Sequence, residues 1–228
     1  MNTAVPLYPG VKGTLDANKG QNRVGHICDH KKTGSHDRGE LSTLAHVDSK
    51  ELLRELFRRI GEDPDREGLR QTPARIVRSW NELFSGYDQR ADDVLVTQFH
   101  AEKYDEMVLL RDVEFYSTCE HHMLPFSGEA HIAYIPDQRI VGLSKLARLL
   151  DVFARRLQVQ ERLTRQIASE LARVLKPKGV AVMMEGKHQC MSCRGVRKRE
   201  GNMITSCLLG AFKENCASRT EFFSLVRT

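Results

Sequence analysis

Two stretches after residue 46 carry apolar residues at the spacing of an α-helix, three and four positions apart. Asp48 or Ser49 can cap the first of these helices, and Gly61 then brings it to an end. Thr72 is expected as the N-cap of the second helix, with Pro73 at its first helical position. The pattern therefore predicts a helical pair, followed by a polar connection to about residue 106. The two apolar stripes consist of Leu52, Leu53, Leu56, Phe57 and Ile60, and of Ile76, Val77, Trp80, Leu83 and Phe84.

The rest of the chain alternates between short β-forming segments and helical stripes. Ser144 can cap the first helix of this part, and Ser218 with Glu221 forms a candidate capping box for a short last helix. The order strand, strand, helix, helix, strand, strand predicts an α+β domain with a mainly antiparallel sheet. The expected elements are strands at 107–115, 129–135, 180–184 and 204–209, and helices at 144–155 and 159–175.

Residues 1–46 carry no periodic apolar pattern and hold six of the 16 glycines. Such a segment buries too little apolar surface to offset the entropy of ordering it, so we expect a mobile tail. An accessory metal-binding tract is a second interpretation, but no ligand cluster of fixed spacing accompanies it, which favours a solvated tail. The side chains in question are His26, Cys28, His30, His36 and His46.

Composition restricts the function only loosely. The 228 residues include 35 Lys and Arg against 30 Asp and Glu, and a net charge of +5 suits an anionic small molecule as well as nucleic acid. No apolar run is long enough to span a bilayer, and the first residues lack the pattern of a secretion signal. Six cysteines are too few for a disulfide framework. We therefore expect a cytoplasmic protein without a membrane partner, whose cysteines are thiols or metal ligands.

The densest chemical signal is a pair of cysteine–histidine clusters, Cys119-Glu-His-His122 and His188-Gln-Cys190-Met-Ser-Cys193. Thiolate and imidazole are the ligands that Zn²⁺ prefers. Two sites fit the spacing: a closed structural site that includes Cys193, and an open three-ligand site of Cys119, His122 and Cys190. His121 and His188 favour the open site, because hydrolysis uses groups that titrate near neutrality. Simple packed thiols, and a redox pair of Cys190 and Cys193, are the remaining interpretations.

A binding module is the main alternative to an enzyme. A zinc knuckle with a closed Cys₃His site could place the basic residues between Lys187 and Arg199 on nucleic acid. Such modules interleave aromatic residues with basic ones, because bases stack on aromatic rings. The segment from Lys187 to Arg199 contains no aromatic residue, which counts against this alternative, so we expect no nucleic acid partner.

Four motifs in this order and spacing resemble GTP cyclohydrolase I, from about residue 47 to the C-terminus. The resemblance implies conversion of GTP to 7,8-dihydroneopterin triphosphate and formate, the first step towards folate or biopterin. It also implies the tunnelling fold, an antiparallel sheet with two packed helices, and a homodecamer with active sites at subunit interfaces. The domains would then be a tail at 1–46, a helical region at 47–106 and a catalytic domain at 107–228. The motifs are Cys119-Glu-His-His122, Gly142-Leu-Ser-Lys145, Gln158-Val-Gln-Glu-Arg-Leu-Thr164, and His188-x-Cys190 with Arg194-Gly195.

The same resemblance implies a role for individual residues. Cys119, His122 and Cys190 match the ligands of one catalytic zinc per subunit, whose bound water would attack carbon 8 of the guanine ring. His121 matches the group that protonates the purine ring nitrogen, and His188 the group that helps to open the ring and the ribose.

The substrate-binding residues are likewise implied by the resemblance. Glu161 matches the carboxylate that reads the base, because it can accept from both the ring N–H and the exocyclic amine of guanine, and Gln160 is expected to assist it. Arg75 matches an arginine that reaches the triphosphate from a neighbouring subunit, whereas Arg78 stands where some relatives carry lysine. The remaining expected phosphate contacts are Ser144, Lys145, Arg148 and Arg194.

Overall fold

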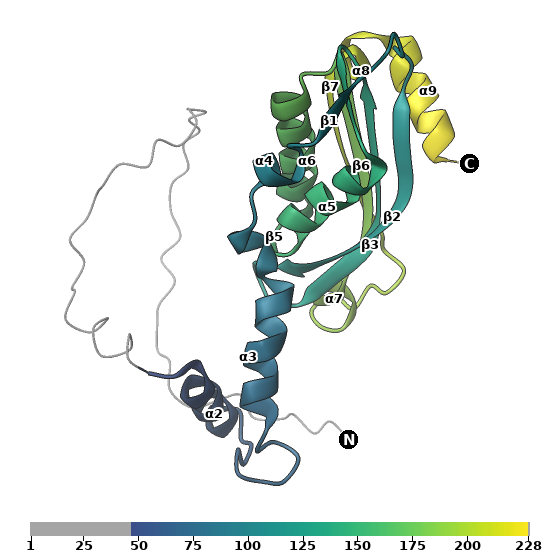
Figure 1. Cartoon of the computed structure of the whole chain (residues 1–228). Coiled ribbons are helices and arrows are strands. Elements are labelled where there is room, and N and C mark those ends of the chain that lie inside the picture. The colour runs from purple at the N-terminus through teal and green to yellow at the C-terminus, as the bar shows by residue number, and fades with distance from the viewer. Residues whose placement is uncertain (1–46, 228) are drawn as a thin grey trace, which may run out of the picture. The chain divides into compact units, whose positions relative to one another are not determined.

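The computed structural model describes residues 47–227, shown in colour in Figure 1. The expected tail at 1–46 and its histidines therefore lie outside the described residues.

The predicted helical pair consists of α2 (Ser49–Arg59) and α3 (Thr72–Leu83), which pack against each other (Figure 1). The Asp48 carboxylate caps α2 by accepting from the backbone N–H of Lys50 at 3.1 Å, as expected. The expectation that Thr72 caps α3 is wrong: the N-cap is Gln71, and the Thr72 hydroxyl donates to the Gly68 carbonyl at 3.3 Å instead of accepting from an N–H of the helix. Only one side of the α2 stripe is buried within the chain, since Leu56 is 51% exposed.

The segment predicted as a polar connection is structured. It contains a 3₁₀ turn (η1, Ser85–Asp88), the short helix α4 (Ala91–Val94) and the strand β1 (Gln98–His100). Strand β1 pairs antiparallel with β4 (Arg139–Val141), another element that the sequence analysis missed. Both strands have three residues, too few for a periodic pattern, and each forms because the other lies beside it.

A five-stranded sheet carries the rest of the fold, in the order β5, β2, β3, β6, β7. Three of its interfaces are antiparallel, and β5 runs parallel to β2 at one edge, so the sheet is mixed and the α+β class is confirmed. The four predicted strands are longer than expected, β2 at its carboxyl end only, because the polar residues at their ends lack the β-forming pattern, and the two-residue β5 was not predicted. Their bounds are β2 (Val108–Cys119), β3 (Pro125–Ile135), β5 (Leu157–Gln158), β6 (Gly179–His188) and β7 (Met203–Gly210).

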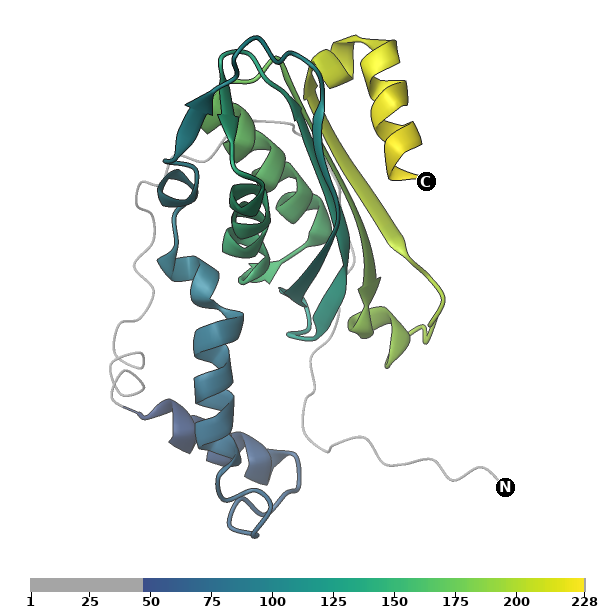
Figure 2. The same cartoon turned by 45° about the vertical axis from the view of Figure 1, so that its right-hand side comes forward.

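Helices α5 (Leu143–Ala154) and α6 (Gln160–Leu175) cover one face of this sheet (Figure 2). The main core lies between them and the strands. The expectation that Ser144 caps α5 is wrong: the N-cap is Gly142, and Ser144 lies in the first turn without a capping bond. Fully buried core side chains include Leu146, Leu149, Leu163, Ile167, Leu171, Ile132, Val182 and Met184.

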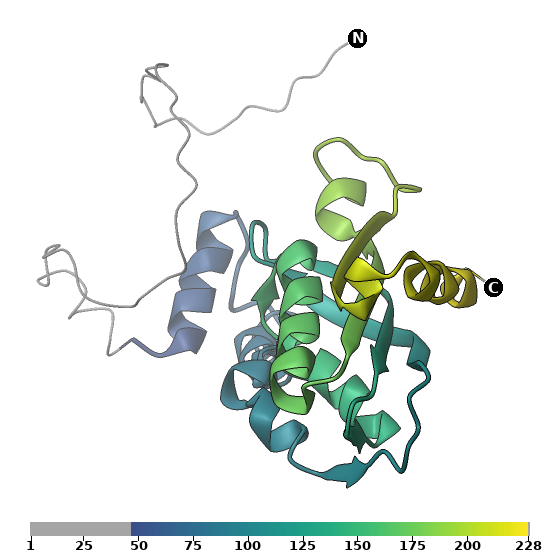
Figure 3. The ribbon, with the colours of Figure 1, turned by 90° about the horizontal axis from the view of Figure 1, so that it is seen from above.

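The opposite face of the sheet is covered at one end by α8 (Ala211–Glu214) and α9 (Cys216–Val226). Figure 3 shows these two helices in yellow, in a view from above. Asn215 caps α9 by accepting from the Ala217 N–H at 2.8 Å, so the capping box expected at Ser218 and Glu221 is wrong. A last short helix, α7 (Gln189–Ser192), joins β6 to the loop before β7. Of the helices in residues 47–227, none has the length and apolar character needed to cross a membrane.

Candidate functional site

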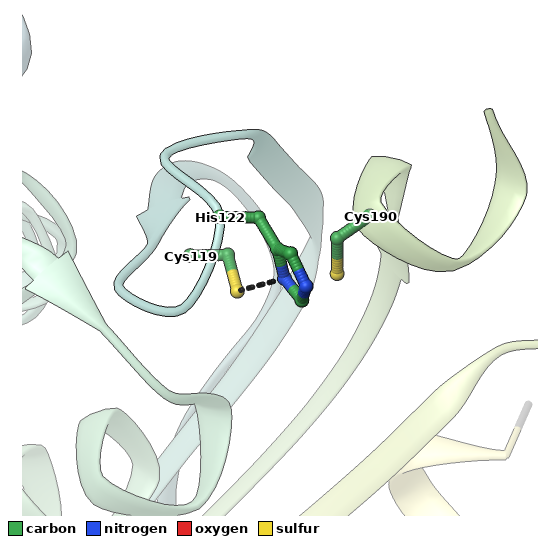
Figure 4. Close-up of side chains that lie close together, drawn as sticks. All are labelled: Cys119, His122 and Cys190. Atoms are coloured by element: carbon green, nitrogen blue, oxygen red, sulfur yellow. Dashed lines mark hydrogen bonds between the residues drawn. The ribbon is translucent and has the colours of Figure 1, made fainter. Parts of the chain in front are cut away.

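Three potential metal ligands converge at one end of the sheet (Figure 4). Cys119 is the last residue of β2, His122 lies in the turn that follows, and Cys190 lies in α7 directly after β6. Strands β2 and β6 are both antiparallel to β3, so their carboxyl ends meet at the same end of the sheet. One ligand atom from each residue lies within 4.8 Å of the others. The topology thus brings together side chains about 70 residues apart in the sequence.

The turn after β2 folds His122 back onto Cys119. The Met123 N–H donates to the Cys119 carbonyl at 2.8 Å, and the Cys119 N–H donates to the Leu124 carbonyl at 2.8 Å. Met123 has a φ of 51°, in the left-handed region that a tight turn requires. The Cys119 Sγ and His122 Nδ1 consequently lie 4.0 Å apart.

The donor set fits a zinc ion with an open coordination position. Two thiols and one imidazole are soft and borderline ligands, and three protein ligands are the pattern of catalytic zinc. Cys193 is exposed and does not belong to the converging group. Burial raises the pKa of the Cys190 thiol, and the neighbouring Cys119 thiol acts in the same direction. A divalent cation would reverse this tendency, because coordination favours the thiolate.

Two further histidines flank the three ligands. The exposed His121 has its Nδ1 3.9 Å from the Cys119 Sγ. His188, the last residue of β6, stacks on Phe126 with ring centroids 4.4 Å apart and planes at 6°. Burial lowers the pKa of His188, while the nearby charge of Glu161 acts in the opposite direction. A metal-ligand cluster therefore lies beside two imidazoles.

Glu161 and Gln160 begin α6 next to this cluster but differ in their surroundings. Glu161 is exposed, whereas Gln160 is fully buried. The Gln160 side-chain oxygen lies 2.9 Å from the Nε2 of His188, and its amide nitrogen donates to protein oxygens only.

An ion pair that the sequence analysis missed connects the ligand turn to α6. The Arg162 guanidinium bonds the Glu120 carboxylate, and it also donates to the Gln158 side-chain oxygen at 3.0 Å. The Glu120 N–H donates to the Gln158 carbonyl at 3.0 Å. Arg162 holds the pKa of Glu120 below its usual range. Both residues lie inside the quoted motifs, but only the fold places them in contact.

We expect Arg162→Ala to weaken zinc binding by about tenfold, because residues that support ligands typically contribute 10–100-fold to metal affinity. The substitution frees Glu120 and with it the turn that carries His122. Competition with a chromophoric chelator measures this affinity. Arg165→Ala, on the exposed side of the same helix, is the matched control and should leave the affinity unchanged. Equal affinities in the two variants would mean that the ion pair does not support the ligand turn.

The expected phosphate-binding residues lie in different places. The Arg194 guanidinium is 3.2 Å from the Nε2 of His122, so it belongs to the cluster. Ser144, Lys145 and Arg148 lie in the first two turns of α5. The opposite end of α5 lies near the cluster. Its last residue, Ala154, accepts a hydrogen bond from the hydroxyl of Ser117 at 2.7 Å, and Ser117 lies two residues before the ligand Cys119 on β2. Ser144 lies ten residues from Ala154, roughly 15 Å along the helix axis.

Arg75 and Arg78 are exposed on α3. Neither guanidinium group forms a hydrogen bond or an ion pair with any residue in 47–227. A cavity of about 660 Å³ separates α3 from the edge of β2 and is lined by Trp80, Phe84 and Tyr116 among others. None of the three metal ligands lines this cavity.

A second group of potential ligands lies on the other face of the sheet, formed by Asp112, Glu129 and His131. Asp112 sits in a bulge of β2 with a φ of 57°, which directs its backbone N–H to the Nδ1 of His131 at 3.2 Å. This bond occupies the Nδ1 of the buried imidazole, which is therefore not free to bind a metal. The carboxylates of Asp112 and Glu129 are exposed, and exposed acidic groups often lie together without binding a metal, so we assign no site to this group.

Known proteins resemble this chain over most of its length. The sequence model of the family described as GTP cyclohydrolase I matches residues 49–227. The chain is 47% identical over 200 residues to GTP cyclohydrolase 1 of Brucella canis, covering 87% of this chain and 89% of that protein. It is 53% identical over 177 residues to GTP cyclohydrolase 1 of Wolinella succinogenes, covering 78% and 95%. Among solved structures, the apo archaeosine synthase QueF-Like aligns with a TM-score of 0.39 and 16% identity, over 46% of this chain and 93% of that one.

Proposed function

This chain belongs to the GTP cyclohydrolase I family of enzymes, and from that premise we propose that it opens the imidazole ring of the guanine of GTP and forms 7,8-dihydroneopterin triphosphate and formate. The observation that carries the proposal is the convergence of Cys119, His122 and Cys190 beside His188. Hydrolysis of a ring C–N bond needs an activated water and groups that move protons, and this cluster offers residues for both tasks.

The three converging residues would hold one zinc ion per subunit. When bound, zinc supplies Lewis acidity that makes a water nucleophilic near neutral pH, which suits attack at carbon 8 of guanine. The chain's own residues then handle the protons: His121 protonates the ring nitrogen that leaves carbon 8, and His188 assists the opening of the base and the ribose. Both side chains are imidazoles, which can accept a proton on one ring nitrogen and donate from the other.

Glu161 would recognise the base. A carboxylate accepts hydrogen bonds from both N1–H and the exocyclic amine of guanine, whereas adenine lacks this pair of donors on one edge. The charge of Glu161 acts on the pKa of His188, which means that the two side chains lie near each other. This proximity supports a base-reading role for Glu161, because His188 would act on the same substrate.

The triphosphate would be held by residues from more than one chain. Arg194 lies at the cluster of its own subunit. The residues Ser144, Lys145 and Arg148 lie at the start of α5, whereas the other end of α5 lies near that cluster. The separation of roughly 15 Å along α5 supports a pocket in which a neighbouring copy supplies these three residues. Arg75 would reach the same phosphates from α3 of a neighbour, with Arg78 as a weaker candidate.

We therefore propose a homo-oligomer, a decamer by family resemblance, with the tunnelling fold. Exposed apolar side chains support association: Leu52, Leu56 and Ile60 on α2 are about half exposed, and Tyr116 at the edge of β2 is 68% exposed. Residues 47–106 would form the helical region and residues 107–228 the catalytic domain.

The closed zinc knuckle is not favoured. It requires Cys193 as a fourth ligand, and that side chain is exposed and outside the converging group.

Incubation of the zinc-loaded protein with GTP is expected to release formate and to give a fluorescent pterin after oxidation. ATP serves as the control substrate, because its base does not present the donors that Glu161 would recognise. Metal content and particle mass by light scattering, measured on the same sample, establish that the assayed species is loaded and assembled. A zinc-loaded oligomer that yields neither formate nor pterin from GTP would refute the proposal.

A further inference from the structure

The orientation of the Gln160 side chain is fixed by the groups around its amide nitrogen. This nitrogen lies 2.8 Å from the Met203 carbonyl and 3.2 Å from the Met184 carbonyl, on the two strands β7 and β6. A carbonyl oxygen only accepts hydrogen bonds, so the amide must turn its two N–H groups towards the strands. The side-chain oxygen therefore faces the other way, towards His188.

A chain of hydroxyl groups supports the same orientation. The Thr164 hydroxyl donates to the Gln160 backbone carbonyl at 2.7 Å, so it accepts from Thr205, 2.6 Å away. The Thr205 oxygen then has a lone pair free to accept from the Gln160 amide nitrogen at 3.2 Å. Every donor in this buried chain has an acceptor only when the Gln160 oxygen points to the histidine.

The contact with Gln160 decides where neutral His188 carries its proton. The amide oxygen lies 2.9 Å from Nε2 and can only accept, so Nε2 must donate. A neutral imidazole has one N–H, which leaves the lone pair on Nδ1. The stacking of the ring on Phe126 holds its plane. Among residues 47–227, nothing forms a hydrogen bond with this Nδ1, so it stays available to substrate.

The fold leaves space for this contact at Gly186. A Cβ at that position would lie 2.5 Å from the Gln160 side-chain oxygen and 3.5 Å from Phe115. Any other residue at 186 would push the amide oxygen from its place beside the histidine. The side chain of Gln160 is itself fully buried, with no polar atom left over for the guanine base.

We propose that Gln160 is a positioning residue that fixes His188 in its Nε2–H tautomer and so makes Nδ1 the atom that exchanges protons with the substrate. This inference rests on the proposed function and replaces a direct contact of Gln160 with the base. Nε2 keeps its proton and its bond to Gln160 throughout, so the substrate meets only the Nδ1 side of the ring.

The first test is a double-mutant cycle on the zinc-loaded oligomer. Gln160→Met keeps the volume but removes the acceptor, and we expect kcat for GTP to fall by about 10–100-fold, with KM changed by less than about threefold. In a His188→Ala background the same substitution should change kcat by less than about twofold, since residues that act as a unit are not additive. Thr205→Val, which removes a bond to the same amide but leaves the histidine contact, is the matched control and should keep kcat within about threefold.

Additive effects of the Gln160 and His188 substitutions would overturn the inference, as would a large rise in KM in Gln160→Met, which indicates direct substrate contact. If Gln160→Met does not assemble, Gly186→Ala replaces it in the cycle, because it displaces the amide oxygen and leaves Gln160 in the chain.

A second test uses the unaltered protein. Solid-state ¹⁵N NMR of the histidine-labelled, zinc-loaded oligomer, with His188 assigned by comparison with His188→Ala, should show a protonated Nε2 and an unprotonated Nδ1. The opposite tautomer would overturn the inference even if the protein turns over GTP. Failure of the proposed function is a separate result, since it appears as an unaltered protein that does not form pterin.

Discussion

Substitution of Cys190 by serine is expected to remove bound zinc and to reduce turnover of GTP to the background of the assay. A serine hydroxyl stays protonated near neutral pH and is a far poorer zinc ligand than a thiolate, and two protein ligands do not make a stable site. The structure places the Cys190 side chain within 4.8 Å of the other two ligand atoms. Metal content per subunit by atomic emission should fall from about one to near zero, with pterin formation lost in parallel.

Cys193→Ser is the matched control, because it makes the same chemical change three positions further along the chain. Its side chain is exposed and outside the ligand group, so zinc content and turnover should both stay close to those of the unaltered protein. Equal loss of zinc in both variants would instead identify a closed Cys₃His site and revive the structural interpretation. Circular dichroism of both variants distinguishes the loss of a ligand from loss of the fold.

Substitution of His121 by alanine is expected to separate chemistry from metal binding. His121 is 63% exposed and lies beside the ligands without belonging to the converging group, so zinc should be retained. Removal of a proton donor typically costs 10²–10⁴-fold, and we expect kcat to fall by about this factor. Steady-state pterin formation and metal content, measured on the same preparation, provide the two readouts.

His100→Ala is the control for this substitution, since His100 is an exposed histidine on β1, outside the cluster. It should change neither readout. An active His121→Ala variant would exclude His121 from the proton transfers, and zinc loss in that variant would make His121 a ligand.

The larger elements of the fold were predictable because their signals are local. The apolar stripes of α2, α3, α5 and α6 recur every three or four residues, and the strands of the main sheet are rich in β-forming residues. Strands β1 and β4 escaped prediction because three residues carry no period and their pairing joins segments about 40 residues apart. The caps of α3, α5 and α9 were misassigned by one to three residues, since several polar residues at each start could have served.

The candidate site divides in the same way. Residue types and spacing indicated a zinc centre at Cys119, His122 and Cys190, and left open whether Cys193 joined it. The three-dimensional arrangement groups the first three and leaves Cys193 exposed, because α7 directs Cys190 and not Cys193 towards the turn after β2. Arg162 carried no signal of its own, since an arginine near a helix start is usually a solvated charge.

Gln160 marks the limit of the sequence most clearly. The family resemblance implied that Gln160 assists Glu161 in contacting the base, and nothing in the local sequence indicated that its side chain is buried. Its burial follows from the packing of α6 on β6 and β7, whose carbonyl groups take up its amide.

The sequence by itself determined which chemistry this protein carries: a thiol–imidazole cluster, two further histidines and a helix-rich α+β chain of the GTP cyclohydrolase I family. Only the tertiary structure decided which of these groups meet, which nitrogen of His188 faces the protein, and which end of α5 lies at the cluster. The physical reason is that residue type and local spacing fix helices, strands and ligand preference, whereas the direction of a buried hydrogen bond depends on acceptors contributed by distant strands.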